Sequence, residues 1–216
     1  MSESLFKQDR KKCYRIFLGT ETPGFFQKWR LIIIHFGLHC VAVYRFGQYT
    51  SKVRKRHRIW GGFLRIIHFS LDLFTRFFHH VRFEVDNIGP GLFIQHTGTI
   101  YVAAEKIGSN FSITHNATVG IGYQKGGMGV PTIGDNVWIG TGAIIYGRIN
   151  IGDSVSISSG SVLTRDIPSR SLVAGFPARV IQANYDNAHY FGPEECTQEG
   201  ESSEEPSQQT SSTDKN

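Results

Sequence analysis

An aliphatic residue recurs every six positions through the second half of this 216-residue chain. A six-residue period with an inward-facing aliphatic side chain is typical of a β-helix, in which three hexapeptides form one triangular coil. A residue one coil further along then stacks at about 4.8 Å, the spacing of neighbouring strands. The repeat therefore predicts the spatial neighbours of most residues from 88 to 168. The recurring aliphatic residues, which we call the aliphatic column, are Ile88, Ile94, Ile100, Ile107, Ile113, Val119, Ile133, Ile139, Ile145, Ile151, Ile157 and Leu163.

The spacing between coils is interrupted twice. One extra residue separates Ile100 from Ile107, and eight extra residues separate Val119 from Ile133. The second insertion, Gly120–Pro131, is rich in glycine and predicts a loop that leaves the helix. Long loops on a rigid scaffold are commonly functional. One corner of the prism is small in every coil, which predicts a tight turn there, and its residues are Gly98, Ala117, Ala143 and Ser161.

Two histidines occupy the same position of successive coils. His96 and His115 are each the third residue of a hexapeptide, where the chain turns between two faces. A neutral imidazole is the usual general base near pH 7. The pair therefore indicates a base beside a hydroxyl-bearing substrate. The alternative is that both are surface histidines at a turn, and the long loop that follows the His115 coil favours the functional interpretation.

Residues 84–181 resemble the serine acetyltransferase branch of the hexapeptide acyltransferases. The segments GSVLTRDIP, residues 160–168, and VAGFPARVI, residues 173–181, are strong signals for the superfamily and weak signals for the acceptor. The resemblance implies a left-handed parallel β-helix, a homotrimer, and acetyl-CoA bound in the groove between subunits. It also implies direct attack of an acceptor hydroxyl on the thioester, with His96 in the place of the catalytic histidine.

The chain departs from that branch where an amino acid would be recognised. Gln95 stands where serine acetyltransferases usually have Asp, and Gly129, Val130 and Pro131 stand where they carry Arg-His-Pro. Losing a charge-assisted contact can cost on the order of 2–3 kcal/mol, so serine binding is poorly supported. The pattern resembles relatives from exopolysaccharide and colanic-acid clusters. The leading prediction is therefore acetylation of a sugar hydroxyl in surface polysaccharide biosynthesis, and the alternative is serine O-acetylation in cysteine biosynthesis.

Individual roles follow from the repeat and from the resemblance. His96 is the predicted base, and His115 is predicted to orient the acceptor or share the proton. Gln95 is either a hydrogen-bond partner of a sugar hydroxyl or a solvated turn residue. The residues predicted to bind CoA are Gly142 and Ala143 through their main chain, Ser161, Arg165 and Arg179; the two arginines are alternatively plain surface charges.

A metal-dependent protein of the γ-carbonic anhydrase kind is a third, weaker interpretation. Such a site needs three histidines, and only His96 and His115 lie in the coils, so no metal is expected. His35 and His39 lie four apart on an apolar helix face, but no carboxylate or Cys is spaced to complete a site with them. The three cysteines of the chain are scattered, which favours a reducing compartment and predicts neither a zinc site nor disulfides.

The two halves of the chain differ in charge. Residues 1–82 contain 16 Lys or Arg and 4 Asp or Glu, whereas residues 83–216 contain 7 and 14. Apolar residues at three- and four-residue spacing predict helices over 29–49 and 59–83, joined by the basic run 52–58. Neither segment has the uninterrupted length of a membrane span. A basic, aromatic helix pair is typical of an interfacial helix; the alternative is a cap on the β-helix. No nucleic-acid motif accompanies the charge.

These observations predict three parts: a basic helical region over 1–82, a β-helix acyltransferase domain over 83–182, and a C-terminal extension over 183–216. From about residue 193 the extension is polar and acidic, which predicts disorder. Residues 1–15 show no cleavable signal peptide, because they are polar and charged. The expected location is the cytoplasm, with peripheral contact at the inner face of the membrane through residues 1–82.

Overall fold

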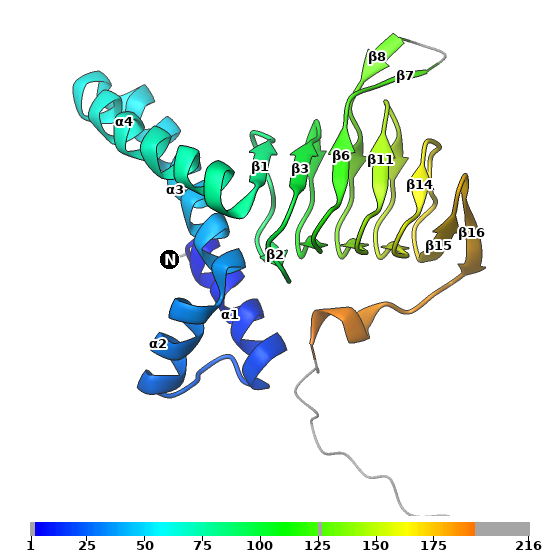
Figure 1. Cartoon of the computed structure of the whole chain (residues 1–216), viewed down its shortest axis with the longest axis horizontal. Helices are drawn as coiled ribbons and strands as arrows, with labels where there is room; N and C mark the ends of the chain where they lie inside the picture. The colour runs from blue at the N-terminus through cyan, green and yellow to red at the C-terminus, as the bar shows by residue number, and fades with distance from the viewer. Residues whose placement is uncertain (1–2, 125–126, 193–216) are drawn as a thin grey trace, which may run out of the picture.

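A computed structural model describes residues 3–124 and 127–192. The chain forms a group of N-terminal helices followed by a left-handed parallel β-helix (Figure 1), so the predicted fold class is confirmed. The predicted disordered tail from residue 193 lies outside the described residues.

The β-helix has three faces, each made of short strands that pair in parallel with the strand one coil further along. The first face contains β1 (Val81–Glu84), β3 (Ile100–Ala103), β6 (Thr118–Gly120), β11 (Ile144–Tyr146) and β14 (Val162–Leu163). The second contains β2 (Phe93–Ile94), β5 (Ser112–Ile113), β10 (Trp138–Ile139), β13 (Ser156–Ile157), β15 (Ser171–Gly175) and the antiparallel β16 (Ala178–Ala183). The third contains β4 (Lys106–Ile107), β9 (Thr132–Ile133) and β12 (Asn150–Ile151).

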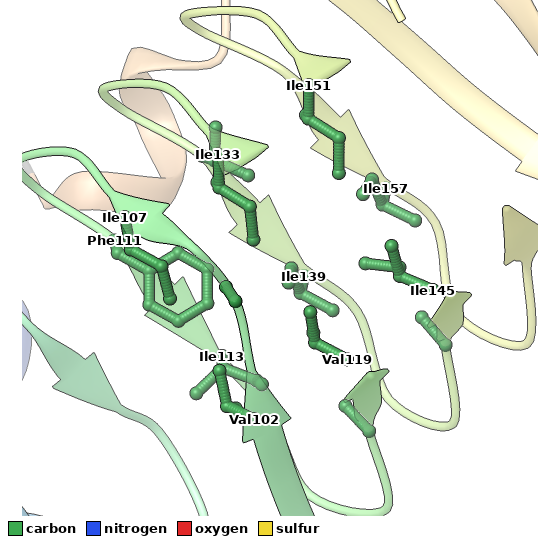
Figure 2. Close-up of a cluster of buried hydrophobic side chains, with 14 of the residues drawn as sticks. Val102, Ile107, Phe111, Ile113, Val119, Ile133, Ile139, Ile145, Ile151 and Ile157 are labelled. Atoms are coloured by element: carbon green, nitrogen blue, oxygen red, sulfur yellow. The ribbon is translucent and has the colours of Figure 1, made fainter. Parts of the chain in front are cut away.

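The aliphatic column forms the core of this prism (Figure 2). Ile113, Ile139 and Ile157 stack in register on one face, and each is fully buried. Phe111 is also fully buried and fills the space between the faces in the second coil. Each buried aliphatic side chain contributes about 1.5–3 kcal/mol relative to an exposed one, so the stacked column fixes the register of the coils.

The first coil departs from the predicted column. Val102, not Ile100, pairs with Val119, while Ile100 pairs with Val81 of the preceding strand. Val102 follows Ile94 by eight positions, whereas Val119 follows Ile113 by six. The sequence did not reveal this shift, because Ile100 and Val102 are both aliphatic and both buried. The extra length lies in the turn that carries His96.

The predicted loop after Val119 contains an antiparallel hairpin, β7 (Gly122–Gln124) and β8 (Gly127–Gly129). It projects beyond the end of β6, away from the body of the prism (Figure 1). Residues 125–126, at its tip, lie outside the described chain. We refer to this hairpin as the arm.

The helical region consists of α1 (Leu5–Leu18), α2 (Phe25–Ile34), α3 (Phe36–Arg56), α4 (Arg58–Phe74) and a π-helical turn (Thr75–His79). The helix predicted over 29–49 is broken at His35, so that prediction is wrong there. His35 leaves helical geometry, and its Nδ1 accepts a hydrogen bond from the Leu38 main-chain N–H, which caps the start of α3. The helix predicted over 59–83 ends at the π-helical turn, because Val81 already belongs to β1.

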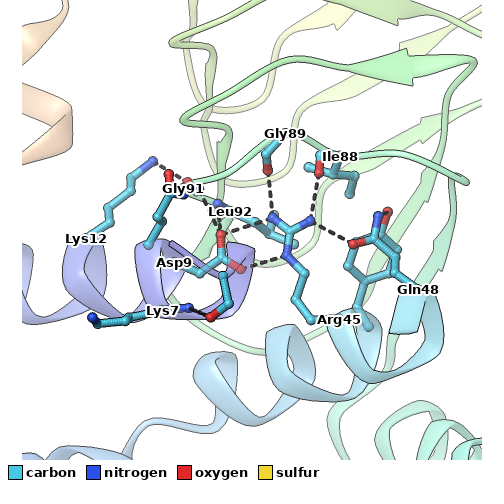
Figure 3. Close-up of polar contacts among 12 residues, drawn as sticks. Lys7, Asp9, Lys12, Arg45, Gln48, Ile88, Gly89, Gly91 and Leu92 are labelled. Atoms are coloured by element: carbon cyan, nitrogen blue, oxygen red, sulfur yellow. Dashed lines mark hydrogen bonds and ion pairs between the residues drawn. The ribbon is translucent and has the colours of Figure 1, made fainter. Parts of the chain in front are cut away.

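Helix α1 belongs to the predicted helical region, although its bounds were not predicted, and it closes the open end of the β-helix (Figure 3). Asp9 accepts hydrogen bonds from the main-chain N–H groups of Gly91 and Leu92 and forms an ion pair with Arg45 of α3, with 2.7 Å between Oδ2 and Nε. Arg45 also donates to the carbonyl groups of residues 88 and 89. Both side chains are buried. The pair therefore satisfies main-chain groups that the first coil could not pair with a preceding coil.

Lys12 continues this cover. Its buried Nζ donates to the carbonyl groups of Gly91 and Asn110 and to Ser112 Oγ. Burial lowers the pKa of the Lys12 ammonium well below its usual range. Asp9, Arg45 and Lys12, which we call the polar cap, thus bind α1 and α3 to the first two coils.

The chain returns along the β-helix after β16. A 3₁₀ turn (Ala188–Phe191) stacks Tyr190 on Trp138, with ring centroids 4.2 Å apart. Phe191 is buried, and its ring lies 4.7 Å from Lys12 Nζ. Residues 184–192, the return segment, therefore connect the last coil back to the helical end (Figure 1).

Among the described residues, no helix taken alone has the length and apolar composition of a membrane span. Helices α2 and α3 meet both criteria only as a pair, and their axes are bent by 86°.

Candidate active site

His96 and His115 lie one above the other at the edge between the second and first faces. His96 follows β2 and His115 follows β5, two strands that pair in register. Their ring centroids are 5.9 Å apart and the rings are inclined by 70°. His96 is exposed and His115 is half-buried. The structure thus brings the two predicted residues together on one edge, whereas their catalytic roles stay a prediction.

The surroundings of His115 differ from those of an ordinary surface histidine. Its Nδ1 is buried and has no hydrogen-bond partner among residues 3–124 and 127–192. Gly98, from the coil above, lies so close that a Cβ added to it would be 3.1 Å from the His115 Cβ. Gly98 also has a φ of 148°, which few other residues adopt. The turn above His115 therefore requires a glycine. The unpartnered Nδ1 of His115 remains available for a hydrogen bond to a ligand.

His96 lies on the longest turn along this edge. Two more residues separate Ile94 from Val102 than separate Ile113 from Val119, and His96 on this longer turn is exposed whereas His115 is half-buried. In the later coils the equivalent positions are Thr141 and Ser159, and Gly142 and Gly160 have φ values of 71° and 70°. The edge therefore changes from two imidazoles in the first coils to small side chains in the last coils. The two imidazoles therefore lie at the helical end of this edge, and the smaller side chains lie toward the last coil.

His35 is the residue near this edge that sequence reasoning missed. From the sequence it was considered only as a metal ligand without partners, but the α2–α3 junction brings it against the main chain of Gln95 and near His96. Its ring packs against Phe17 and Phe93, at 4.5 and 5.9 Å between centroids. Burial lowers the pKa of His35, and the Gln95 main chain partly offsets this. No local signal could have revealed the proximity, because it arises from packing between residues 60 apart.

Gln95 is half-buried beside His96, and its main-chain N–H donates to the Ile113 carbonyl group. Either predicted role of Gln95, contact with the acceptor or solvated turn residue, is compatible with that position. Its side chain can accept a hydrogen bond through the amide oxygen but carries no charge.

The predicted main-chain donors for CoA are engaged within the β-helix. The Gly142 N–H donates to the His115 carbonyl group, and the Ala143 N–H donates to the Gly140 carbonyl group, each at 3.2 Å. A bound thioester would therefore have to share these donors. Their assignment to CoA stays a prediction.

The other predicted CoA residues differ in exposure. Ser161 is buried, and its Oγ has no hydrogen-bond partner within the described chain. Arg165 is exposed in the turn after β14, and Arg179 is exposed on β16. The structure places all three in the last coils, away from the histidine pair. Their contact with CoA stays a prediction.

Within residues 3–124 and 127–192, no group of three or more His, Cys, Asp or Glu side chains is placed to hold a metal ion.

The sequence matches known proteins along most of its length. Residues 131–165 match the family model described as bacterial transferase hexapeptide (six repeats). A serine acetyltransferase of Helicobacter pylori is 30% identical over 163 residues, which cover 74% of this chain and 90% of that protein. The chain belongs to the serine acetyltransferase family. A serine acetyltransferase of Mycobacterium tuberculosis is 33% identical over 130 residues, which cover 59% of this chain and 57% of that protein.

Solved structures agree with this family. The crystal structure of Neisseria gonorrhoeae serine acetyltransferase superposes with a TM-score of 0.64 at 26% identity, covering 86% of this chain and 66% of that longer chain. The same enzyme in complex with serine gives a TM-score of 0.62 at 27% identity, covering 82% and 68%. This member of the serine acetyltransferase family is therefore an acyltransferase, and the prediction of acetyl-CoA as co-substrate is confirmed at the level of the family.

The prediction of a sugar acceptor is wrong by the same comparisons. The relatives that match are serine acetyltransferases, and none of those described above acts on a polysaccharide by name. The inference failed because it treated three absent side chains as the only means of binding an amino acid. Residues from other coils can supply such contacts, and the repeat alone does not show which of them reach the site.

Proposed function

We propose that this protein transfers the acetyl group of acetyl-CoA to the hydroxyl group of L-serine. The observation that carries the proposal is the histidine pair on one edge of the β-helix, in a chain that aligns with 90% of a serine acetyltransferase. General base catalysis of this kind typically contributes ~10²–10⁴-fold to a rate.

The chemistry needs one base and no covalent enzyme intermediate. A ring nitrogen of His96 removes the proton of the serine hydroxyl as its oxygen attacks the thioester carbonyl carbon. The resulting tetrahedral oxyanion collapses and breaks the carbon–sulfur bond. The thiolate of CoA leaves and takes the proton back from the imidazolium. The products are O-acetylserine and CoA with a free thiol, so atoms and charge balance. His115, adjacent to His96, orients the base or the acceptor.

Arg148 is the residue that supports recognition of the serine carboxylate. Gly129 stands where the resembling enzymes carry an arginine, and a Cβ at Gly129 would lie 2.8 Å from both Cβ and Nε of Arg148. The Arg148 side chain therefore occupies the space that a side chain at 129 would need. Its Nη2 lies 3.5 Å from the Met128 carbonyl oxygen, at the base of the arm. Arg148 is exposed and forms no ion pair with a carboxylate of the described chain, so it remains able to bind an anion.

Gln95 supports a weaker contact with the serine ammonium group. Its amide oxygen can accept one ammonium hydrogen, but a neutral acceptor binds less tightly than a carboxylate. We therefore expect a higher KM for serine than an enzyme with Asp at this position would show.

A homotrimer with CoA bound between copies is part of the same proposal. The arm and Arg148 lie at a different edge of the prism from His96, so a neighbouring copy would have to bring them together. Light scattering of the purified protein should give the mass of three chains. A monomer that is fully active would contradict this arrangement.

The decisive experiment measures thiol release from acetyl-CoA in the presence of L-serine, with mass spectrometry to identify O-acetylserine. L-serinamide and D-serine serve as matched acceptors that alter the carboxylate or the configuration. We expect L-serine to be the best of the three. Thiol release that does not depend on L-serine, with no O-acetylserine formed, would refute the proposed acceptor.

A further inference from the structure

The helix α4 packs with its polar side inward and its apolar side outward. Gly61 lies against Arg54 of α3, since a Cβ at Gly61 would be 2.3 Å from the Arg54 Cα. Seven residues after Gly61, His68 lies against Gly47 of α3. Seven residues later, Thr75 is buried on the same side. The face that contacts α3 is therefore made of small and polar residues.

The opposite face of α4 and its π-helical turn is large, aromatic and exposed. Most of its residues are separated by three, four or seven positions along the helix, so they form a single stripe. Ile59 is 89% exposed, Trp60 69% and Phe77 73%. We call this surface the α4 face, and it comprises Ile59, Trp60, Phe63, Ile66, Ile67, Phe74, Phe77 and Phe78. A surface helix of a globular protein presents its polar side to water, so the α4 face requires a cover.

Basic residues border the α4 face. Residues 36–79 contain eight Lys or Arg and one Asp. Five of the basic residues lie at the α3–α4 junction, are exposed, and form no ion pair with a carboxylate of the described chain: Lys52, Arg54, Lys55, Arg56 and Arg58. This junction begins the α4 face, because Ile59 directly follows Arg58. The cover must therefore be apolar in its interior and anionic at its surface.

We propose that the α4 face docks on the surface of a lipid membrane that contains anionic lipids. An aromatic stripe lies at the depth of the acyl chains, while the basic junction contacts lipid phosphates, as in interfacial amphipathic helices. A second copy of this chain fits less well, because it would place two basic surfaces against each other. Residues 193–216 contain no aromatic residue and no Ile, Leu, Val or Met, so that segment has no large apolar side chains to cover the face.

The test is flotation of the full-length protein with vesicles of phosphatidylcholine alone and with about 30% phosphatidylglycerol. We expect binding to the anionic vesicles and much weaker binding to the neutral ones. Each basic residue near a membrane surface changes the partition coefficient by about fivefold at low ionic strength. Raising the salt concentration should therefore reduce binding, because it screens these charges.

Two variants separate the apolar and basic contributions. Phe63→Ser with Phe77→Ser should abolish binding to both vesicles, whereas Phe176→Ser, an 82% exposed aromatic on the β-helix, should leave it unchanged. Arg54→Gln with Arg56→Gln should remove the preference for anionic vesicles. Lys106→Gln with Arg170→Gln removes the same number of positive charges from the β-helix and should leave that preference unchanged.

A measurement on folded protein guards against misfolded variants. Trp60 is exposed on the α4 face, so its fluorescence should shift to shorter wavelength when anionic vesicles are added. Trp60→Phe should lose most of that shift, although Trp29 and Trp138 remain. The proposal is overturned if the wild-type protein does not float with anionic vesicles. It is also overturned if the Phe63→Ser, Phe77→Ser variant binds vesicles normally while dissociating an assembly of the wild-type protein, since a second copy would then cover the face.

Discussion

The β-helix and the helical region place their apolar residues in opposite ways. In the β-helix, Ile113, Ile139 and Ile157 point into a closed prism and are inaccessible to water. In the helical region, α4 points Ile59 away from the protein, and the π-helical turn after it does the same with Phe77. The first arrangement makes a rigid edge on which side chains keep fixed positions. The second leaves a surface that is available to a partner. The proposed chemistry and the proposed membrane attachment therefore belong to different parts of the chain.

The largest expected effect concerns the rigid edge. His96→Ala should lower kcat with L-serine by ~10²–10⁴-fold, because it removes the proposed general base. Steady-state thiol release measures the loss, and circular dichroism checks the fold. His80→Asn is a matched control, since His80 is exposed and its φ of 53° suits Asn. A His96→Ala variant that retains a tenth or more of the activity would contradict the assignment.

The next effect concerns the junction between the two regions. Asp9→Asn should lower the free energy of unfolding by about 3–5 kcal/mol, because it leaves Arg45 buried without its counter-charge. Denaturant titration measures the change. Glu3→Gln removes solvent-accessible ion pairs with Lys7 and Lys11 and should change stability little. Equal effects of the two substitutions would mean that the polar cap does not hold the helices on the first coil.

A smaller effect concerns the acceptor. Arg148→Ala should raise the KM for L-serine by ~10–100-fold with little change in kcat, since one charged hydrogen bond contributes about 1.5–3 kcal/mol. L-serinamide lacks the carboxylate, so the variant and the wild type should use it equally. Arg148→Lys should restore part of the affinity for L-serine. A uniform loss with both acceptors would indicate a structural role for Arg148.

The smallest effect is an absence of reaction. Burial raises the pKa of the Cys13 and Cys40 thiols to about 12. Far below that pKa almost no thiolate is present, so iodoacetamide at pH 8 should modify neither residue in the native protein. Reactivity of both should rise only as the pH approaches 12 or when denaturant unfolds the helices. A Cys196→Ser background avoids the third thiol, and mass spectrometry counts the labels. Rapid labelling of the native protein would show that the inner side of the helical region opens as readily as its outer side.

The sequence predicted the β-helix well, because a six-residue period is a local signal that each coil repeats. It also predicted that His96 and His115 share an edge, which follows from counting. It misplaced Ile100 because turn lengths vary between coils and both aliphatic candidates were suitable. It could not predict the contact between Asp9 and Arg45, the space that Arg148 occupies beside Gly129, or the approach of His35 to Gln95. Those contacts join residues far apart in sequence, and no period connects them.

The same limit applied to the helices. Apolar spacing predicted a helix over 59–83, of which the structure forms α4 up to Phe74, but it did not reveal which side meets α3. Gly47 and Gly61 mark that side, because Gly61 allows the main chain of α3 to approach at Arg54 and Gly47 leaves space for the His68 ring. The acceptor was mispredicted for a related reason. Motif positions such as Gly129 show what is absent locally and do not show what another coil supplies.

The return segment has a mechanical consequence. A Cβ at Gly192 would lie 3.2 Å from Arg15 Cγ, so the chain comes back to α1 after running the length of the β-helix. A force applied between residues 3 and 192 would therefore first load the contact between α1 and the return segment. The stacked coils of the β-helix would not carry that force. Detachment of residues 184–192 should come first and should expose Trp138, while the prism behind it stays intact.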